Sequence, residues 1–171
     1  MGQWSKEMKE ILKQTKIAEQ QRKMIETQRK LSELNKELLM LQKRLNILRN
    51  CKEQKECILK PKIEERKIPR ERLSPYATKW TEDVVTDYLI SDSSGNNINC
   101  RKYLYGVLDC DVVNDIFNVY HNLKPIYIKE NEPLWQLLVL DYIDYTERAI
   151  KNYQEDIAKI LKEYEGKSNE A

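Results

Sequence analysis

The chain has 171 residues, 34% of them charged, and a formal net charge of +2. This charge is too small to indicate that the whole protein binds nucleic acid. It is unevenly distributed, because residues 1–67 carry a net charge of +8 whereas residues 68–131 carry −2 and residues 132–171 carry −4. The longest apolar stretch, Leu134–Leu140, is too short to span a bilayer.

The N-terminal part predicts one long helix with a heptad seam. Residues 3–60 contain neither proline nor glycine and would extend up to ~90 Å as a helix. Apolar residues recur at alternating spacings of three and four, with Thr27 as the one polar position, which is the repeat of a coiled coil. The predicted seam residues are Met24, Leu31, Leu34, Leu38, Leu41, Leu45 and Leu48. Such a narrow seam needs a second helix, from this chain or from another.

Residues beside a coiled-coil seam select the partner. The predicted partner-selecting flanks are basic: Lys23, Lys30, Arg44 and Arg49. In a parallel homodimer Arg44 of one strand would face and repel Arg49 of the other. We therefore expect hetero-association first, pairing with the last helix of the same chain second, and a parallel homodimer third. An antiparallel arrangement avoids the repulsion and stays an open alternative.

The segment 61–75 is predicted to be a linker. It is charged and contains Pro61, Pro69 and Pro75, which interrupt regular structure. The linker should separate the coiled coil from the part of the chain that holds thirteen of the fourteen aromatic residues.

Residues 76–165 are expected to form a small helical module. Within it, residues 82–90 can form a helix capped by Thr81 or a strand rich in β-branched residues, and we expect the helix. A turn over 91–97 should follow. Further expected elements are helices starting near Asn99 and at Asp111, and a short extended connection over 126–128.

A second heptad seam is predicted in the last helix, residues 133–164, where Pro133 suits the first turn. Its seam residues are Ile143, Ile150, Tyr153, Ile157 and Ile160. Acidic residues lie beside this seam, opposite in sign to the flanks of the first. Residues 166–171 are expected to be a polar tail after Gly166 ends the helix.

The sequence contains no catalytic, cofactor-binding or metal-binding signature. The four cysteines are Cys51, Cys57, Cys100 and Cys110. They show no paired CxxC spacing, and His121 is the only histidine. Residues 1–20 lack the apolar core of an export signal, so we expect reduced thiols and an intracellular protein, cytoplasmic or nuclear. Acylation of Gly2 is left open, although Lys6 stands where the acylation motif prefers Ser or Thr.

These patterns predict a mostly α protein with a long N-terminal coiled coil, a proline-containing linker and a small C-terminal helical module ending in a long amphipathic helix. Its expected function is that of a non-enzymatic scaffold or adaptor subunit. The coiled coil would bind a coiled-coil protein partner and the module another component, with no cofactor or small-molecule substrate. The alternative is binding of nucleic acid or an anionic membrane surface by the basic N-terminal helix, although no aromatic residue is interleaved there for base stacking.

Overall fold

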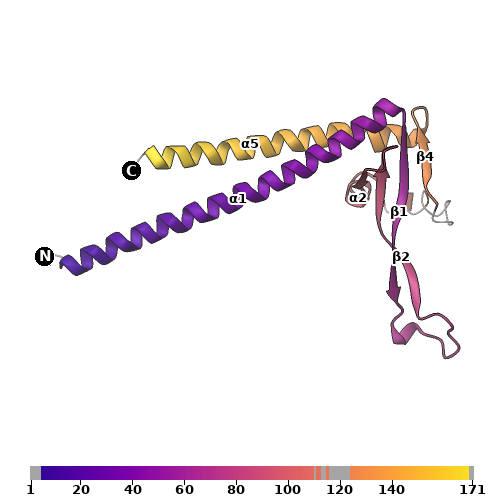
Figure 1. Ribbon diagram of the computed structural model, residues 1–171, viewed down its shortest axis with the longest axis horizontal. Helices are drawn as coiled ribbons and strands as arrows, with labels where there is room; N and C mark the ends of the chain where they lie inside the picture. Colours follow the sequence, from indigo (N-terminus) through magenta and orange to yellow (C-terminus); the bar gives the residue numbers. More distant parts are fainter. Residues whose placement is uncertain (1–4, 110, 113–114, 116–123, 170–171) are drawn as a thin grey trace. The chain divides into compact units, whose positions relative to one another are not determined.

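The computed structural model describes residues 5–109, 111, 112, 115 and 124–169. Figure 1 shows the elements in chain order. Their bounds are α1 Lys6–Gln54, β1 Glu56–Lys67, the 3₁₀ turn η1 Arg70–Arg72, β2 Thr81–Ser91, β3 Asn97–Asn99, α2 Arg101–Val107, β4 Ile126–Lys129, α4 Pro133–Trp135, the π-helical η2 Gln136–Asp141 and α5 Tyr142–Asn169. The helices at the two ends of the chain were expected, whereas most of the structure between them was not.

The predicted mostly α fold class was wrong, because the middle of the chain forms a four-stranded antiparallel sheet. The strand order is β3-β2-β1-β4, so β1 and β2 are the central strands (Figure 1). The fold is therefore a mixed α/β fold in which the sheet separates the two long helices along the chain.

β1 occupies residues that the sequence assigned to the coiled coil and to the linker. Cys57 and Leu59 are buried and alternate with more exposed neighbours, which is the period of a half-buried strand. Pro61 pairs with Tyr88 of β2, at a point where β4 no longer runs along β1. Strands tolerate proline where one side has no neighbour, so Pro61 lies inside β1 and does not interrupt regular structure there, contrary to the prediction. The small module predicted over residues 76–165 therefore leaves out β1, the strand that pairs with β2.

The helix expected over residues 82–90 was also wrong, because these residues lie in β2. Val84, Val85 and Thr86 are β-branched in succession, and such side chains lose more rotamer freedom in a helix than in a strand. The possible cap at Thr81 instead begins the strand, where its hydroxyl donates a hydrogen bond of 2.6 Å to the Glu65 carboxylate on β1.

α1 ends at Gln54 rather than at residue 60. The next residue, Lys55, has a φ of +59°, which is in the left-handed region. The residue that takes this conformation after the end of a helix is usually glycine. This single residue turns the chain from the helix directly into β1.

The chain divides into two compact units, and both long helices cross the division. The first unit consists of residues 1–42 and 147–171, whose described residues are almost entirely helical. The second unit, residues 43–146, contains the sheet, α2 and the start of the last helix.

The core of the second unit brings together side chains from the end of α1, the sheet and the C-terminal helices. Its fully buried side chains include Leu48, Cys51, Cys57, Leu59, Ile90, Ile128, Leu138, Val139 and Tyr142. The hydroxyl of Tyr103 donates a 2.9 Å hydrogen bond to the carbonyl of Leu137. Leu137 lies in η2, where π-helical winding changes the backbone bonding pattern, so this side chain supports the irregular turn.

Other predictions for the C-terminal part had mixed outcomes. Pro133 occupies the first turn of α4, as expected, and residues 126–128 are extended. α5 continues beyond Gly166 to Asn169, so the expected helix end was wrong. The helix predicted after Asp111 lies largely outside the described residues, as do Cys110 and His121 entirely. Among the helices that the structure describes, none combines the length and the apolar character needed to cross a bilayer.

Candidate functional site

In the first unit, the heptad positions form the covered side of both helices. Leu31, Leu34 and Leu38 are half-buried and Leu41 is buried, whereas Met24 is exposed. The half-buried seam residues of α5 are Ile150, Tyr153, Ile157 and Ile160. This is the burial pattern of two ladders that face each other within the unit, the arrangement that the sequence ranked second. Association of either seam with a partner stays a prediction.

The remaining seam residues and two of the flanks belong to the second unit. Leu45, Leu48 and Ile143 are buried in its core. Of the flanks, Lys23 and Lys30 in the first unit and Arg49 in the second are exposed, but Arg44 is half-buried. Three of the four predicted partner-selecting side chains thus reach the surface, and the fourth makes contacts within the chain.

Arg44 packs on an aromatic cluster. Its guanidinium carbon lies 4.8 Å from the ring centroid of Tyr142 and 5.9 Å from that of Tyr145, and its Nε donates a 3.0 Å hydrogen bond to Thr146. The ring of Tyr142 in turn stacks on that of Tyr103, with centroids 3.8 Å apart and planes at 2°. A partly desolvated cation over aromatic faces is worth more than an exposed one, so this cluster ties the end of α1 to α2 and α5.

The phenols of this cluster are held in the neutral form. Burial raises the pKa of Tyr103 to about 12, with a smaller contribution from the charge of Asp141. Burial also raises the pKa of Tyr142, against the opposing effect of Arg44. Both rings therefore offer π faces rather than phenolate charge to Arg44, which indicates a structural cluster and not an acid–base site.

Three cysteines lie in the core of the second unit as free thiols. Burial raises the pKa of Cys51 and of Cys57 to about 12, and that of Cys100 as well. The Cys100 thiol lies 3.2 Å from the Tyr88 carbonyl and the Cys51 thiol 3.7 Å from that of Ser91, so both can donate to strand β2. Protonated, buried thiols are poor nucleophiles and poor metal ligands.

A buried carboxylate organises the turn between β2 and β3. Asp92 is 1% exposed and accepts hydrogen bonds from the backbone N–H groups of Ser94 and Asn96, both at 3.0 Å. The side-chain amides of Asn96 and Asn50 donate to its other oxygen at 3.2 and 3.3 Å. Burial alone would raise the pKa of Asp92, but these hydrogen bonds outweigh it and lower the pKa. The turn expected over 91–97 is therefore present and attached to α1 through Asn50.

Residues 61–87 form a two-stranded arm, here called the ribbon arm. β4 pairs only with Glu56–Leu59 and β3 only with Leu89–Ser91, so both outer edges of the arm lack a strand neighbour among the described residues. A register shift after Lys62 leaves Thr86 as an extra residue of β2, which is a β-bulge.

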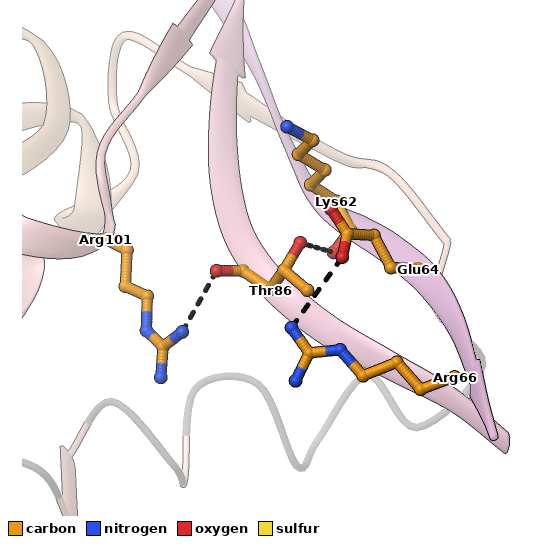
Figure 2. Close-up of polar contacts among 5 residues, drawn as sticks. All are labelled: Lys62, Glu64, Arg66, Thr86 and Arg101. Carbon is orange, nitrogen blue, oxygen red and sulfur yellow. Dashed lines mark hydrogen bonds and ion pairs between the residues drawn. The ribbon is translucent and has the colours of Figure 1, made fainter.

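Side chains bind the backbone groups that this bulge disturbs, as Figure 2 shows. The Thr86 hydroxyl donates a 3.3 Å hydrogen bond to the Lys62 carbonyl, and Arg101 donates a 3.0 Å bond to the Thr86 carbonyl. The Arg101 backbone N–H also donates to Asp87, at 3.3 Å. Arg101 begins α2, so the base of the ribbon arm is attached to that helix, while Arg66 farther along β1 forms a 3.7 Å ion pair with Glu64.

The distal end of the ribbon arm is basic and aromatic. Its residues 66–80 contain five basic side chains and one acidic one, a net charge of +4, although Arg72 is paired with Glu82 at 2.8 Å. Tyr76 is 90% exposed and Trp80 69% exposed. The part of the arm nearer its base carries the compensating acidic residues. The net charge therefore changes sign along the arm.

The chain matches no protein-family model, no curated protein and no solved structure. Among the described residues, no group of three or more His, Cys, Asp or Glu side chains is arranged to hold a metal ion. The candidate functional sites are two surfaces, namely the long helix α1 and the ribbon arm.

Sequence reasoning missed the ribbon arm and the role of Arg44. The arm was hidden because proline and alternating charges in PKIEERK suggested a linker. One signal could have found it: β-branched and aromatic residues over 84–90, preceded by a proline-containing loop, are typical of a hairpin. For Arg44 the heptad position indicated only a flank, and no local pattern indicates which distant tyrosine will stack on it.

Proposed function

We propose that this protein is a non-enzymatic scaffold or adaptor subunit that pairs with a protein partner through its long N-terminal helix. The observation that carries the proposal is a set of large apolar side chains exposed at heptad spacing on one side of α1. These are Ile11, Ile25 and Leu39, which are fourteen residues apart, and Ile17 and Met24, which are seven apart. Exposed apolar surface that recurs along one element is typical of an interaction site.

The second part of the proposal is that the other component binds to the second unit. The ribbon arm supports this, because it presents two exposed aromatic side chains at the end of strands whose edges lack neighbours among the described residues. Exposed aromatic residues are enriched at binding hot spots. The buried free thiols of the core support an intracellular location, cytoplasmic or nuclear.

The experiment compares the full chain with its Ile17→Asp/Met24→Asp variant. Both side chains are exposed on α1, so two carboxylates there would lie unpaired in a partner interface at a cost of several kcal/mol while the pairing with α5 stays intact, and the variant should lose its association with partners. Affinity purification would identify the partners and sedimentation would give the mass. Emission of the buried Trp135 should be unchanged, because it reports on the second unit. Lys43→Asp, an exposed change on the same helix, is the matched control. Unchanged partners and mass in the double variant would refute the proposal.

A second candidate function, binding of an anionic ligand such as single-stranded nucleic acid, is favoured by the arm tip. There Trp80 and Tyr76 accompany the cations, whereas α1 offers cations without interleaved aromatic residues. Salt-dependent binding of an oligonucleotide that Trp80→Ala weakens, and that the matched change Tyr127→Ala on β4 does not, would favour this candidate.

A further inference from the structure

The charges of α1 are confined to one side of the helix. With Met24 at heptad position a, all ten charged residues of the segment 14–42 fall at positions c, f and g. Positions d, a, e and b contain none. An α-helix advances 100° per residue, so these four positions cover an uncharged arc of about 160°. A single partner helix needs only the narrow a and d seam.

The part of this arc outside the seam forms a second line of positions, here called the second stripe. Its residues, spaced alternately by four and three, are Gln14, Ala18, Gln21, Ile25, Gln28, Ser32, Asn35, Leu39 and Gln42. Every one of them is exposed, while the neighbouring seam residues from Leu31 to Leu41 are half-buried or buried. The second stripe therefore has the spacing of a packing surface but lacks a covering element among the described residues.

A groove lies on the second stripe. It has a volume of ≈ 520 Å³ and is lined by Gln28, Leu31, Ser32, Asn35, Lys36 and Leu39. Ser32 is the smallest side chain of this lining, and beside the larger Gln28 and Leu39 it leaves the kind of hollow into which a side chain of a packed helix inserts. α5 offers no comparable second line, because the equivalent positions beside its seam include Asp144, Glu147 and Lys151.

The charges along the outer border of the stripe specify the partner. Position f, next to b, carries Arg22, Arg29 and Lys36, all exposed and none in an ion pair with a described residue. A second copy packed antiparallel on the stripe would oppose these cations with its own. We infer that the second stripe docks a helix of another protein whose apolar seam is flanked by acidic residues. This inference deepens the proposed function by naming a surface for the partner and its chemistry.

The test uses the full chain and two labelled four-heptad peptides with identical Leu and Ile seams, one flanked by Glu and the other by Lys. Fluorescence anisotropy should show that the Glu peptide binds at least roughly tenfold more tightly, and that high salt reduces the difference. Leu39→Ser should weaken binding by roughly tenfold, because a leucine is lost from the interface. Met40→Ser is the matched control, because Met40 is 64% exposed and Leu39 55% but Met40 lies at position c. It should change affinity by less than about twofold.

A charge-reversal variant tests whether the preference for the acidic peptide can be inverted. Arg29→Glu/Lys36→Glu should transfer the preference to the Lys peptide. The inference is overturned by equal binding of both peptides, by no binding of either, or by equal losses from Leu39→Ser and Met40→Ser. A dimer of the chain that Leu39→Ser dissociates would assign the stripe to a second copy instead. These variants leave Ile17 and Met24 intact, so their failure is distinguishable from failure of the proposed function.

Discussion

Replacing Asp92 by alanine should destabilise the second unit more than any other single loss of a carboxylate in the described chain. The change removes an acceptor that is 1% exposed and receives four hydrogen bonds of 3.0 to 3.3 Å. Hydrogen bonds to a charged group contribute about 1.5–3 kcal/mol each when their loss strands a buried partner. Three of the four donors lie in a surface turn, where water can replace part of this, so we expect a loss of about 3 kcal/mol. Asp83→Ala, at an exposed position of β2, is the control and should change stability by less than about 0.5 kcal/mol.

The pH dependence of the Asp92→Ala effect separates the carboxylate from simple packing. Because the folded pKa of Asp92 is lowered, its stabilisation is complete above the unfolded value of about 3.9 and is lost as the pH falls through the folded pKa. Urea unfolding followed by tryptophan emission should therefore give the full difference between wild type and variant at pH 7 and a shrinking one below about pH 4. A difference that is absent at pH 7, or that does not change with acid, would refute this reasoning.

Three further outcomes follow from local geometry. Lys55→Gly should raise the free energy of unfolding in urea by about 0.5–1 kcal/mol, since glycine relieves a left-handed φ; no gain would mean that the turn is unstrained. Cys51 and Cys57, with pKa values raised to about 12, should resist a thiol reagent at pH 8 and react after unfolding; rapid native labelling would contradict their burial. Arg44→Lys keeps the charge but loses the planar stack, so stability should fall by about 1–2 kcal/mol, while Arg29→Lys, at an exposed position of α1, should have a smaller effect. Equal effects of the two changes would contradict a stabilising stack at Arg44.

The helices were predictable because their signal is local and repeated. Met24 to Leu48 hold one spacing over seven turns, and Pro133 marks the start of the last helical run. The sheet was not predictable in the same way, since its evidence is non-local. The sequence of β1 has the composition of a charged linker, and only its pairing with β2 identifies it as a strand. The same pairing explains how Pro61 is accommodated. Cross-strand partners, rather than strand propensity, decide such segments.

The candidate sites, too, were predictable from the sequence only where their signal is local. The second stripe is visible in the sequence once position b is considered with e, because Ile25, Ser32 and Leu39 recur every seven residues. The sequence could not show that the side chains of the second stripe are exposed. An uncharged position beside a seam is uninformative until the structure shows that the seam is covered and the position is not. The Arg44 cluster could not be predicted from the sequence at all, because its other members, residues 103, 142, 145 and 146, are distant from Arg44 in the chain.

The charge pattern of α1 also bears on the choice between its two proposed kinds of partner. Position c holds Glu19, Glu26 and Glu33, and each of the first two precedes a lysine by four residues, Lys23 and Lys30. That spacing and order suit attraction along a helix. The acidic row therefore screens the basic row at position g, which weakens α1 as a track for a phosphate backbone. The basic row at position f follows the same glutamates by three residues and is also partly screened, but it borders the uncharged arc, where an acidic helix would meet it. Charges so arranged select a partner surface better than they bind a polyanion, which is why the long helix supports the adaptor function more than nucleic-acid binding.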